Sequence, residues 1–260
     1  MIAAGIDAGS RAIKVVLFDN TSGQVLAQGW ADQGVEQSQL AGVLFDRLLT
    51  EHDLTRGKIK AVVATGYGRD AIDFADTTIT EITCHARGVY HLLPEAGTVI
   101  DIGGEDSKVI SLDGRGMVRD FAMNDRCAAG TGRFLEVVGK QLGTSLSSLG
   151  AMAARSQAPA AISSMCVVFA ETEIIGLLAA RTPREDIVAG VQTAIAERVA
   201  GMAGRHVKAP IVFTGGVALV SGMKEALERV LGQVVSVAPE PQMTGALGAA
   251  LLAAERYGDN

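Results

Sequence analysis

Two cysteines each stand directly before a segment with the residue pattern of a helix. Cys127 lies in the glycine-rich stretch 124–134, which runs into an apolar-periodic segment, and Cys166 precedes the apolar run 167–180. The two form no Cys-x-x-Cys pair, and their spacing fits no zinc motif. A [4Fe–4S] cluster is held by four thiolates, whereas the chain has three cysteines. Two chains that each supplied Cys127 and Cys166 across a twofold axis would complete the set.

The position of these cysteines at helix N-termini suits an anionic cluster. Because a helix N-terminus carries partial positive charge, four such ends would stabilise the cluster and favour its reduced state. Free cysteine is, however, most often a small buried apolar residue, and composition alone favours that alternative. The third cysteine, Cys84, is interpreted as structural, since a ligand role within one chain would need a missing partner. His85 and His206 are interpreted as ordinary helix or loop residues.

A turn between two short predicted strands has the residues of a phosphate-binding loop. In the stretch 7–10, Gly9 lets backbone N–H groups approach an anion and Ser10 adds a hydroxyl. Lys14, on the following strand, would place a point charge on a phosphate. Asp7 would hold Mg²⁺ through water, because magnesium prefers carboxylate and phosphate oxygens. Taken alone, the pattern also fits an ordinary hairpin turn.

The second half of the chain repeats this design. Asp101 is followed by Gly103, Gly104 and Glu105 in another predicted hairpin. Two more glycine-containing loops are candidates for the rest of a nucleotide: Gly215 and Gly216 after a strand for the adenosine, and Gly245 at the start of the last helix. The sequence has neither a Gly-x-x-x-x-Gly-Lys-Ser/Thr P-loop nor a strand followed by Gly-x-Gly-x-x-Gly, so a P-loop and a Rossmann site are both excluded.

The elements that would carry these loops follow one order twice. Three short strands, then helix and strand, are predicted in each half, and each half opens with Ile-Asp-x-Gly. The pattern predicts an α/β protein of two similar halves with a ligand cleft between them. The first half would comprise residues 1–95 plus 243–260, because the final helix packs back on it, and the second half residues 96–242. The predicted strands are 3–7, 13–18, 25–30, 59–64, 98–102, 108–112, 117–122, 211–214 and 234–237. The predicted helices are 38–50, 244–256, those that begin near residues 131, 166 and 184, and one between the strands 211–214 and 234–237.

Composition excludes several classes of partner. The net charge is −6, with no basic cluster and few aromatic residues, which argues against nucleic acid and anionic membranes. No apolar run reaches the roughly 18 residues of a membrane span. The N-terminus lacks the basic region of a signal peptide, so we expect a cytoplasmic protein without structural disulfides.

The arrangement of the loops resembles the superfamily that contains acetate kinase, sugar kinases, heat-shock ATPases and actin. The resemblance covers essentially the whole chain and implies two ribonuclease H-like halves that clamp ATP and Mg²⁺ in an interdomain cleft. The segments around the cysteines, 124–135 and 163–173, are similar to signature segments of a narrower family: the ATP-dependent activators of 2-hydroxyacyl-CoA dehydratases and the ATPase subunits of benzoyl-CoA reductase. The segments 64–69 and 82–88 resemble the same family.

This family resemblance implies a homodimer with one [4Fe–4S] cluster on Cys127 and Cys166 of both chains. It implies that ATP binding and hydrolysis to ADP open the angle between the helices at the cluster. The reduced protein then passes one low-potential electron to an iron–sulfur dehydratase or reductase, and reduced ferredoxin or flavodoxin is the expected donor. Among the matched positions, Gly66, Gly130 and Thr131 are expected to bind cofactor.

The residues expected to serve ATP hydrolysis are Asp7, Asp101 and Glu105. Glu105 departs from the family's Gly-Gly-Gln-Asp: a glutamine would orient water, whereas a glutamate would act as a base or bind Mg²⁺ indirectly.

Three other functions stay open. An ATPase subunit of a benzoyl-CoA reductase-type complex would co-purify with a paralogous chain. A small-molecule kinase on the same scaffold would use Asp101 as its base and phosphorylate its substrate without iron, but it would leave the cysteine segments unexplained. A chaperone-like ATP switch would need a peptide-binding domain that the chain lacks.

Overall fold

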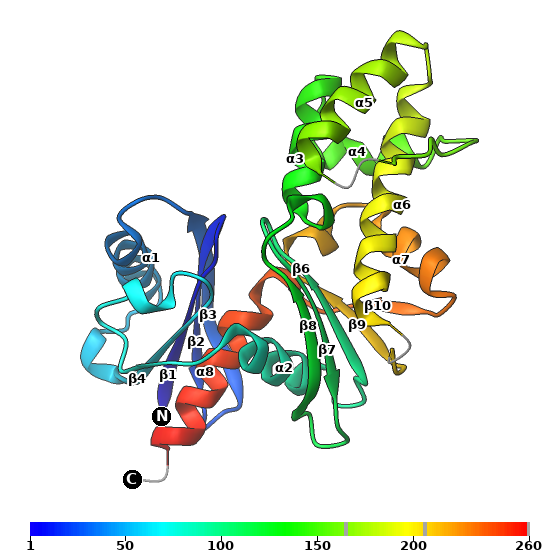
Figure 1. The fold of residues 1–260 in the computed structure, drawn as a ribbon. Coiled ribbons are helices and arrows are strands. Elements are labelled where there is room, and N and C mark those ends of the chain that lie inside the picture. Colours follow the sequence, from blue (N-terminus) through cyan, green and yellow to red (C-terminus); the bar gives the residue numbers. More distant parts are fainter. Residues whose placement is uncertain (164–165, 205–206, 259–260) are drawn as a thin grey trace. The chain divides into compact units, whose positions relative to one another are not determined.

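The computed structural model describes residues 1–163, 166–204 and 207–258. Its contacts divide the chain into two units, each built around its own five-stranded sheet (Figure 1). Unit 1 comprises residues 1–95, 112–118 and 242–260, and unit 2 residues 96–111 and 119–241. Ser164 and Met165, which belong to a signature segment of the sequence, and His206 lie outside the described residues.

The sheet of unit 1 has the strand order β3-β2-β1-β4-β5. Strand β1 pairs antiparallel with β2 and parallel with β4, so it occupies the centre of the sheet. The strands are β1 (Ile2–Ala8), β2 (Ala12–Asp19), β3 (Gln24–Asp32), β4 (Ile59–Thr65) and β5 (Thr77–Thr78), and the helices are α1 (Gln37–Glu51), α2 (Glu81–Leu92) and α8 (Thr244–Tyr257).

Both faces of this sheet are covered by helices, which explains why β1 is a nearly continuous apolar run. Ala4, Ile6 and Ala8 pack with α1 in one apolar cluster. Ala3, on the opposite face, packs with α8 in another. Because side chains alternate along a strand, Asp7 lies on the same face as Ala3. The C-terminal helix therefore packs on the face of the first sheet that carries Asp7.

Unit 2 repeats the strand order as β8-β7-β6-β9-β10. Its central strand β6 again pairs antiparallel with the next strand and parallel with β9. The strands are β6 (Thr98–Ile102), β7 (Ser107–Leu112), β8 (Val118–Asn124), β9 (Ile211–Thr214) and β10 (Val235–Val237), and the helices are α3 (Gly132–Leu142), α4 (Leu146–Ala153), α5 (Val167–Ala179), α6 (Arg184–Ala203) and α7 (Met223–Leu231).

The helices of unit 2 pack on its sheet through one large apolar cluster. Phe134 of α3, Ile187 of α6 and Leu227 of α7 are fully buried with Ile100 and Phe213 of the sheet. Together with the repeated strand order, this arrangement confirms the predicted α/β fold class. Helices α2 and α4 and the short β5 were not predicted from the sequence.

Candidate functional site

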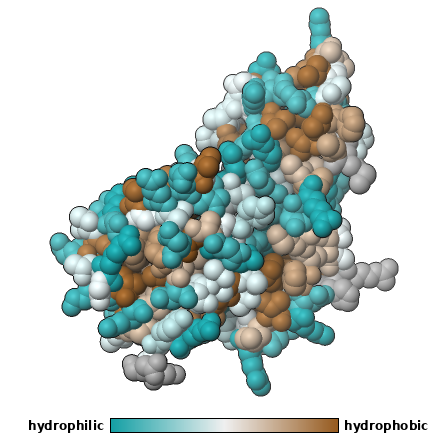
Figure 2. Space-filling view, turned by 60° about the vertical axis from the view of Figure 1, so that its left-hand side comes forward, coloured by the Kyte–Doolittle hydropathy of each residue, from teal (hydrophilic) through white to brown (hydrophobic). Residues whose placement is uncertain are grey.

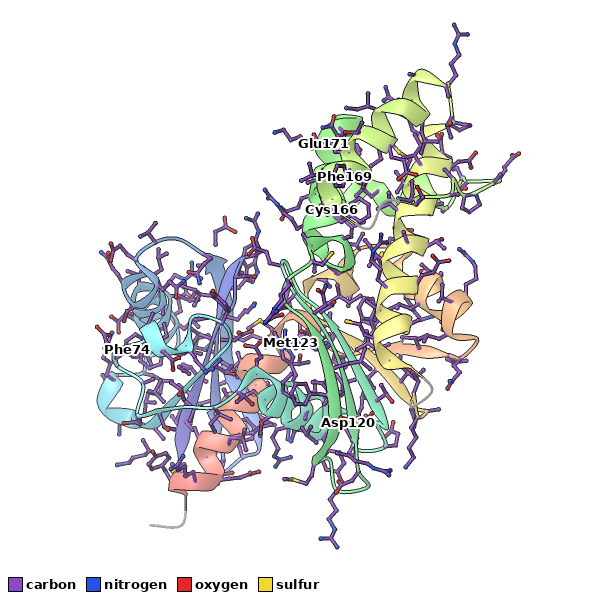
Figure 3. All side chains as sticks on the ribbon, in the orientation of Figure 1. Phe74, Asp120, Met123, Cys166, Phe169 and Glu171 are labelled. Carbon is purple, nitrogen blue, oxygen red and sulfur yellow. The ribbon has the colours of Figure 1, made fainter. Side chains whose placement is uncertain are left out.

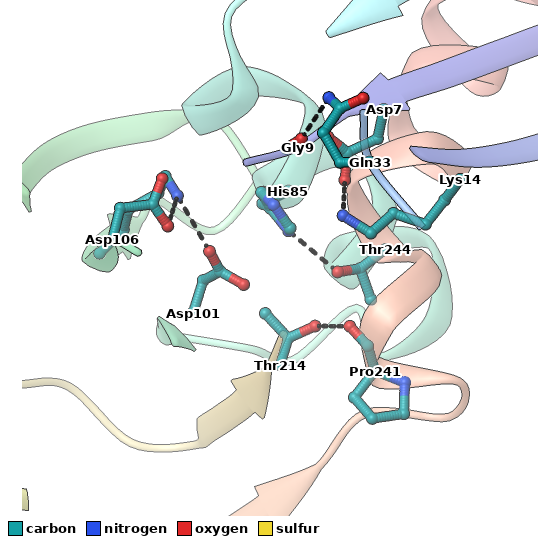
Figure 4. Close-up of polar contacts among 11 residues, drawn as sticks. Asp7, Gly9, Lys14, Gln33, His85, Asp101, Asp106, Thr214, Pro241 and Thr244 are labelled. Carbon is teal, nitrogen blue, oxygen red and sulfur yellow. Dashed lines mark hydrogen bonds and ion pairs between the residues drawn. The ribbon is translucent and has the colours of Figure 1, made fainter. Parts of the chain in front are cut away.

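The β1–β2 hairpin brings two of the predicted phosphate-site residues together. Strand register places Asp7 opposite Lys14, and Lys14 Nζ lies 3.0 Å from Asp7 Oδ2 (Figure 4). The turn is closed by the N–H of Gly9, which donates to the carbonyl of Ala12 at 3.1 Å. Gln33 Nε2 donates to the carbonyl of Gly9 at 2.8 Å and holds the turn from the end of β3. The hairpin thus presents a carboxylate and an ammonium group as a fixed pair.

Two glycines make room for the Asp7 carboxylate. Gly66 follows β4 with φ +88°, and a β-carbon there would lie 2.4 Å from Asp7 Oδ1. Gly245, in the first turn of α8, would place a β-carbon 3.1 Å from Asp7 Oδ2 and 3.1 Å from His85 Nε2. The structure therefore brings Gly66 and Gly245, which are far apart in sequence, to the same carboxylate. The sequence alone did not indicate this relationship between them.

Unit 2 contains the same arrangement around Asp101. Register places Asp101 opposite Lys108, and Lys108 Nζ lies 3.1 Å from Asp101 Oδ2 and 2.8 Å from Asp106 Oδ1. The N–H of Gly103 donates to the carbonyl of Asp106 at 2.9 Å, as Gly9 does to Ala12 in unit 1. Lys108 is 3% exposed, so its charge is balanced by carboxylates inside the protein.

The glycine after the fourth strand is repeated as well. Gly215 has φ +86°, and a β-carbon there would lie 2.6 Å from Asp101 Oδ1 and 2.4 Å from the carbonyl oxygen of Ile102. The preceding Thr214 donates through its hydroxyl to the carbonyl of Pro241 at 2.5 Å (Figure 4). A left-handed backbone in direct contact with a carboxylate requires glycine at both Gly66 and Gly215. The duplication thus extends from strand order to individual atoms.

The remaining predicted loop residues belong to these two hairpins or follow the strands beside them. Ser10 and Gly104 are partly exposed, and Glu105 and Gly216 are exposed. A carboxylate at the end of a central strand, with glycine backbone around it and a lysine ammonium beside it, has the groups needed to hold Mg²⁺ through water and a phosphate oxygen through charge.

Cys127 begins a short turn that leads into α3. It is partly buried and precedes the single 3₁₀ turn Ala128–Gly130. Thr131 is the N-cap of α3: its Oγ1 accepts from the N–H of Arg133 at 3.3 Å and donates to the carbonyl of Ala128 at 2.8 Å. Gly130, the last residue of this turn, is buried. Thr131 and Gly130 therefore shape the turn after Cys127.

Cys166 is the N-cap residue of α5 and is exposed. The helix that follows carries apolar side chains at the surface, with Val168 68% and Phe169 70% exposed. Figure 3 shows Cys166, Phe169 and Glu171 along the beginning of α5, and Figure 2 shows apolar side chains gathered on the surface of the helical layer of unit 2. Large exposed apolar patches on a folded chain mark interaction surfaces.

The comparison with known families decides the identity of this arrangement. Residues 4–253 match the model of the BadF/BadG/BcrA/BcrD ATPase family. The chain belongs to this family. The 2-hydroxyisocaproyl-CoA dehydratase activator of Clostridioides difficile is 44% identical over 254 residues, which cover 97% of this chain and 95% of the relative. A benzoyl-CoA reductase chain of Thauera aromatica is 33% identical over 267 residues, which cover 98% of this chain and 94% of that one.

Solved structures agree with this assignment. The activator of the 2-hydroxyisocaproyl-CoA dehydratase from Clostridium difficile with bound ADPNP superposes with a TM-score of 0.93 at 43% identity, covering 100% of this chain and 96% of that one. A glucokinase of the ROK family from Streptomyces griseus shares the fold alone, with a TM-score of 0.59 at 14% identity over 98% of this chain and 100% of the kinase. The predicted family is confirmed, and the fold shared with the kinase agrees with the predicted fold class.

The third cysteine of this family member is buried in unit 1. Cys84 is inaccessible to solvent and lies among the apolar residues between the sheet and α8. Burial raises the pKa of its thiol from 9.0 to about 12. A thiol that resists ionisation is a poor metal ligand and a poor nucleophile. The position agrees with the structural role expected for Cys84.

Two residues with important contacts beside these carboxylates are not among the predicted ones. Lys108 and Asp101 are separated by the same number of residues as Lys14 and Asp7. That repeated spacing is the sequence signal that could have indicated Lys108 as a site residue. His85, expected to be an ordinary helix or loop residue, lies in α2 and shares a buried hydrogen bond of 2.9 Å between its Nδ1 and Thr244 Oγ1 (Figure 4). Nothing in the local sequence of His85 or Thr244 indicates that contact.

In the part of the chain that the structure describes, no group of three or more histidine, cysteine or acidic side chains is placed to hold a metal ion. Over the same residues, no helix is both long and apolar enough to cross a membrane.

Proposed function

We propose that this chain is an ATP-dependent electron donor that activates an iron–sulfur enzyme of the 2-hydroxyacyl-CoA dehydratase type. The proposal is supported by membership of the ATPase family and by the activator that is 44% identical over nearly the whole chain. The observation that carries it within this chain is the pair Cys127 and Cys166, each at the N-cap of a helical segment in unit 2. A kinase would have no use for thiols at those positions.

Each hairpin offers groups for nucleotide binding: a carboxylate at the end of its central strand, a glycine turn and a lysine beside the carboxylate. The carboxylates of Asp7 and of Asp101 are each suited to hold Mg²⁺ through water, and Lys14 is suited to donate to a phosphate oxygen. Lys108 is buried more deeply and keeps Asp101 and Asp106 in place. Glu105, exposed in the second hairpin, is the candidate to orient or deprotonate the attacking water. The glycine backbone of both hairpins gives the phosphates close access to N–H groups.

The donor set of this chain fits half of a [4Fe–4S] site. Four thiolates are required, and Cys84 is withdrawn from solvent, which leaves Cys127 and Cys166. Two chains related by a twofold axis would together supply four. The exposed Val168 and Phe169 beside Cys166 give such a pair of chains an apolar surface to bury. When bound, the cluster would supply one-electron chemistry at low potential, with reduced ferredoxin or flavodoxin as the donor.

Anaerobic purification with iron and sulfide counted per chain tests this function. About two irons per chain are expected, because one four-iron cluster is shared by two chains. Cys127→Ser and Cys166→Ser should each abolish iron binding and leave ATP affinity intact, whereas Cys84→Ser, the matched control, should keep its iron. A full iron content in either ligand variant, or none in the native chain after reconstitution, would overturn the proposal.

A second candidate is an ATPase subunit of a benzoyl-CoA reductase-type complex, favoured by the relative that carries that name. In that case the partner in the dimer would be a paralogous chain. Purification from the native source distinguishes the two, since a homodimer contains one polypeptide and the alternative contains two.

A further inference from the structure

The side chain of Asn124 forms hydrogen bonds with both the N–H and the carbonyl of Cys127. Asn124 Oδ1 accepts from the N–H of Cys127 at 3.0 Å, and Asn124 Nδ2 donates to the carbonyl of Cys127 at 2.7 Å. Both polar groups of the cysteine's own backbone are therefore bound by one amide. Only one orientation of the amide allows this, because the flipped amide would face donor against donor and acceptor against acceptor.

Asn124 is itself held in place. It is the last residue of β8 and is partly buried. A β-carbon on Gly130 would lie 3.3 Å from Asn124 Nδ2 and 3.6 Å from Ser107 Oγ, so the amide fits closely against the turn that follows Cys127. These contacts leave the amide little freedom to move, and they connect the end of the strand to the cysteine.

The residues between Asn124 and Cys127 give little support of their own. Arg126 has a side chain that is 94% exposed, and that of Asp125 is also exposed. The two residues after β8 therefore form a solvent-exposed loop, and the hydrogen bonds between Asn124 and Cys127 close that loop. Without the Asn124 amide, the backbone of Cys127 would lose the two hydrogen bonds that close this loop.

We propose that Asn124 is the positioning residue for the Cys127 thiolate. The inference rests on the proposed role of Cys127 as a ligand. Two hydrogen bonds to one residue fix its backbone dihedral angles, and those angles set the direction of the Cα–Cβ bond that carries the sulfur. Groups that orient a ligand typically change metal affinity by about 10- to 100-fold when removed.

Two substitutions separate the contributions of the two hydrogen bonds between Asn124 and Cys127. Asn124→Ala removes both hydrogen bonds. Asn124→Asp keeps the acceptor for the Cys127 N–H but turns a carboxylate oxygen toward the Cys127 carbonyl, so one bond is replaced by repulsion. Asn20→Ala is the matched control, because Asn20 is exposed in unit 1.

The test measures iron release to a chelator and the electron paramagnetic resonance spectrum of the reduced, reconstituted protein. Asn124→Ala should lose iron about tenfold faster than the native chain and show altered g-values, with ATP affinity unchanged. Asn124→Asp should also lose iron faster, and Asn20→Ala should behave as native. Native release and a native spectrum in both Asn124 variants would overturn the inference.

A second measurement needs no iron and distinguishes failure of this inference from failure of the proposed function. In the iron-free chain, the rates at which iodoacetamide alkylates Cys127 and Cys166 are followed by mass spectrometry. Asn124→Ala should change the rate at Cys127 and leave Cys166 as its internal reference. Equal rates at Cys127 in the native chain and the variant would refute the positioning role even if the chain binds no cluster.

Discussion

The carbonyl of Gly103 accepts a hydrogen bond from the N–H of Gly132 at 2.9 Å. The next carbonyl, that of Gly104, accepts from Arg133 at 2.8 Å. The first N–H groups of a helix have no partner within it, and here two of them in α3 are bound by the β6–β7 hairpin. A displacement of the hairpin therefore acts directly on α3 and on the turn that begins at Cys127.

Gly132→Ala should weaken this connection. A β-carbon at Gly132 would lie 3.1 Å from the Gly103 oxygen and 3.1 Å from Val217 Cγ2, so helix and hairpin must separate slightly. The rate of Cys127 alkylation should differ between ATP and ADP in the native iron-free chain, and that difference should shrink in the variant. Gly201→Ala, where a β-carbon meets open space, is the control. An undiminished nucleotide response in Gly132→Ala would contradict the coupling.

The two lysines should differ in what their removal costs. Lys108→Met leaves the carboxylates of Asp101 and Asp106 without their cation, and breaking a buried ion pair by removing one partner costs about 3–5 kcal/mol. The Lys14 side chain is 18% exposed against 3% for Lys108, so Lys14→Met should cost less stability than Lys108→Met but weaken ATP binding. Urea unfolding and nucleotide titration of both variants measure the two effects. Equal losses of stability would show that the burial of Lys108 does not matter.

Short apolar runs separated by turn residues predicted most of the strands, and the same order of elements in both halves supported the prediction. The same reasoning missed α2, since the buried face of Glu81–Leu92 includes the polar His85 beside apolar residues such as Val89. Asp7 and Lys14 could be paired in advance because they face each other across one hairpin. The contacts that Gly66 and Gly245 share with Asp7 depend on strands and helices distant in sequence, which local patterns do not encode.

Helices α2 and α8 approach so closely that glycine is required at their contact. A β-carbon on Gly248 would lie 1.8 Å from the carbonyl oxygen of Cys84. Although alanine is the better helix former by about 1 kcal/mol, Gly248→Ala should destabilise the protein by about 3 kcal/mol through overpacking. Gly57→Ala, at a site with no atoms within 4 Å of the new carbon, should change stability by less than about 0.5 kcal/mol. Thermal or urea unfolding compares them, and similar midpoints would refute the close packing.

Cys84 should stay protonated in the folded protein well above the pH at which an ordinary thiol ionises. Its pKa is raised to about 12 by burial, from 9.0. As the pH rises from 9.0 toward about 12, the unfolded thiol ionises before the folded one, so the free energy of unfolding falls. The contribution of Cys84 is the difference between the native chain and Cys84→Ala over that range.

Alkylation at about pH 8, below the ordinary pKa of a thiol, checks the burial of Cys84 directly. Iodoacetamide should modify Cys127 and Cys166 in the folded, iron-free chain and leave Cys84 unmodified until the protein unfolds, because the thiolate is the reactive form and Cys84 is both buried and protonated. Rapid labelling of Cys84 under native conditions would show that the α2–α8 layer opens far more readily than its packing implies.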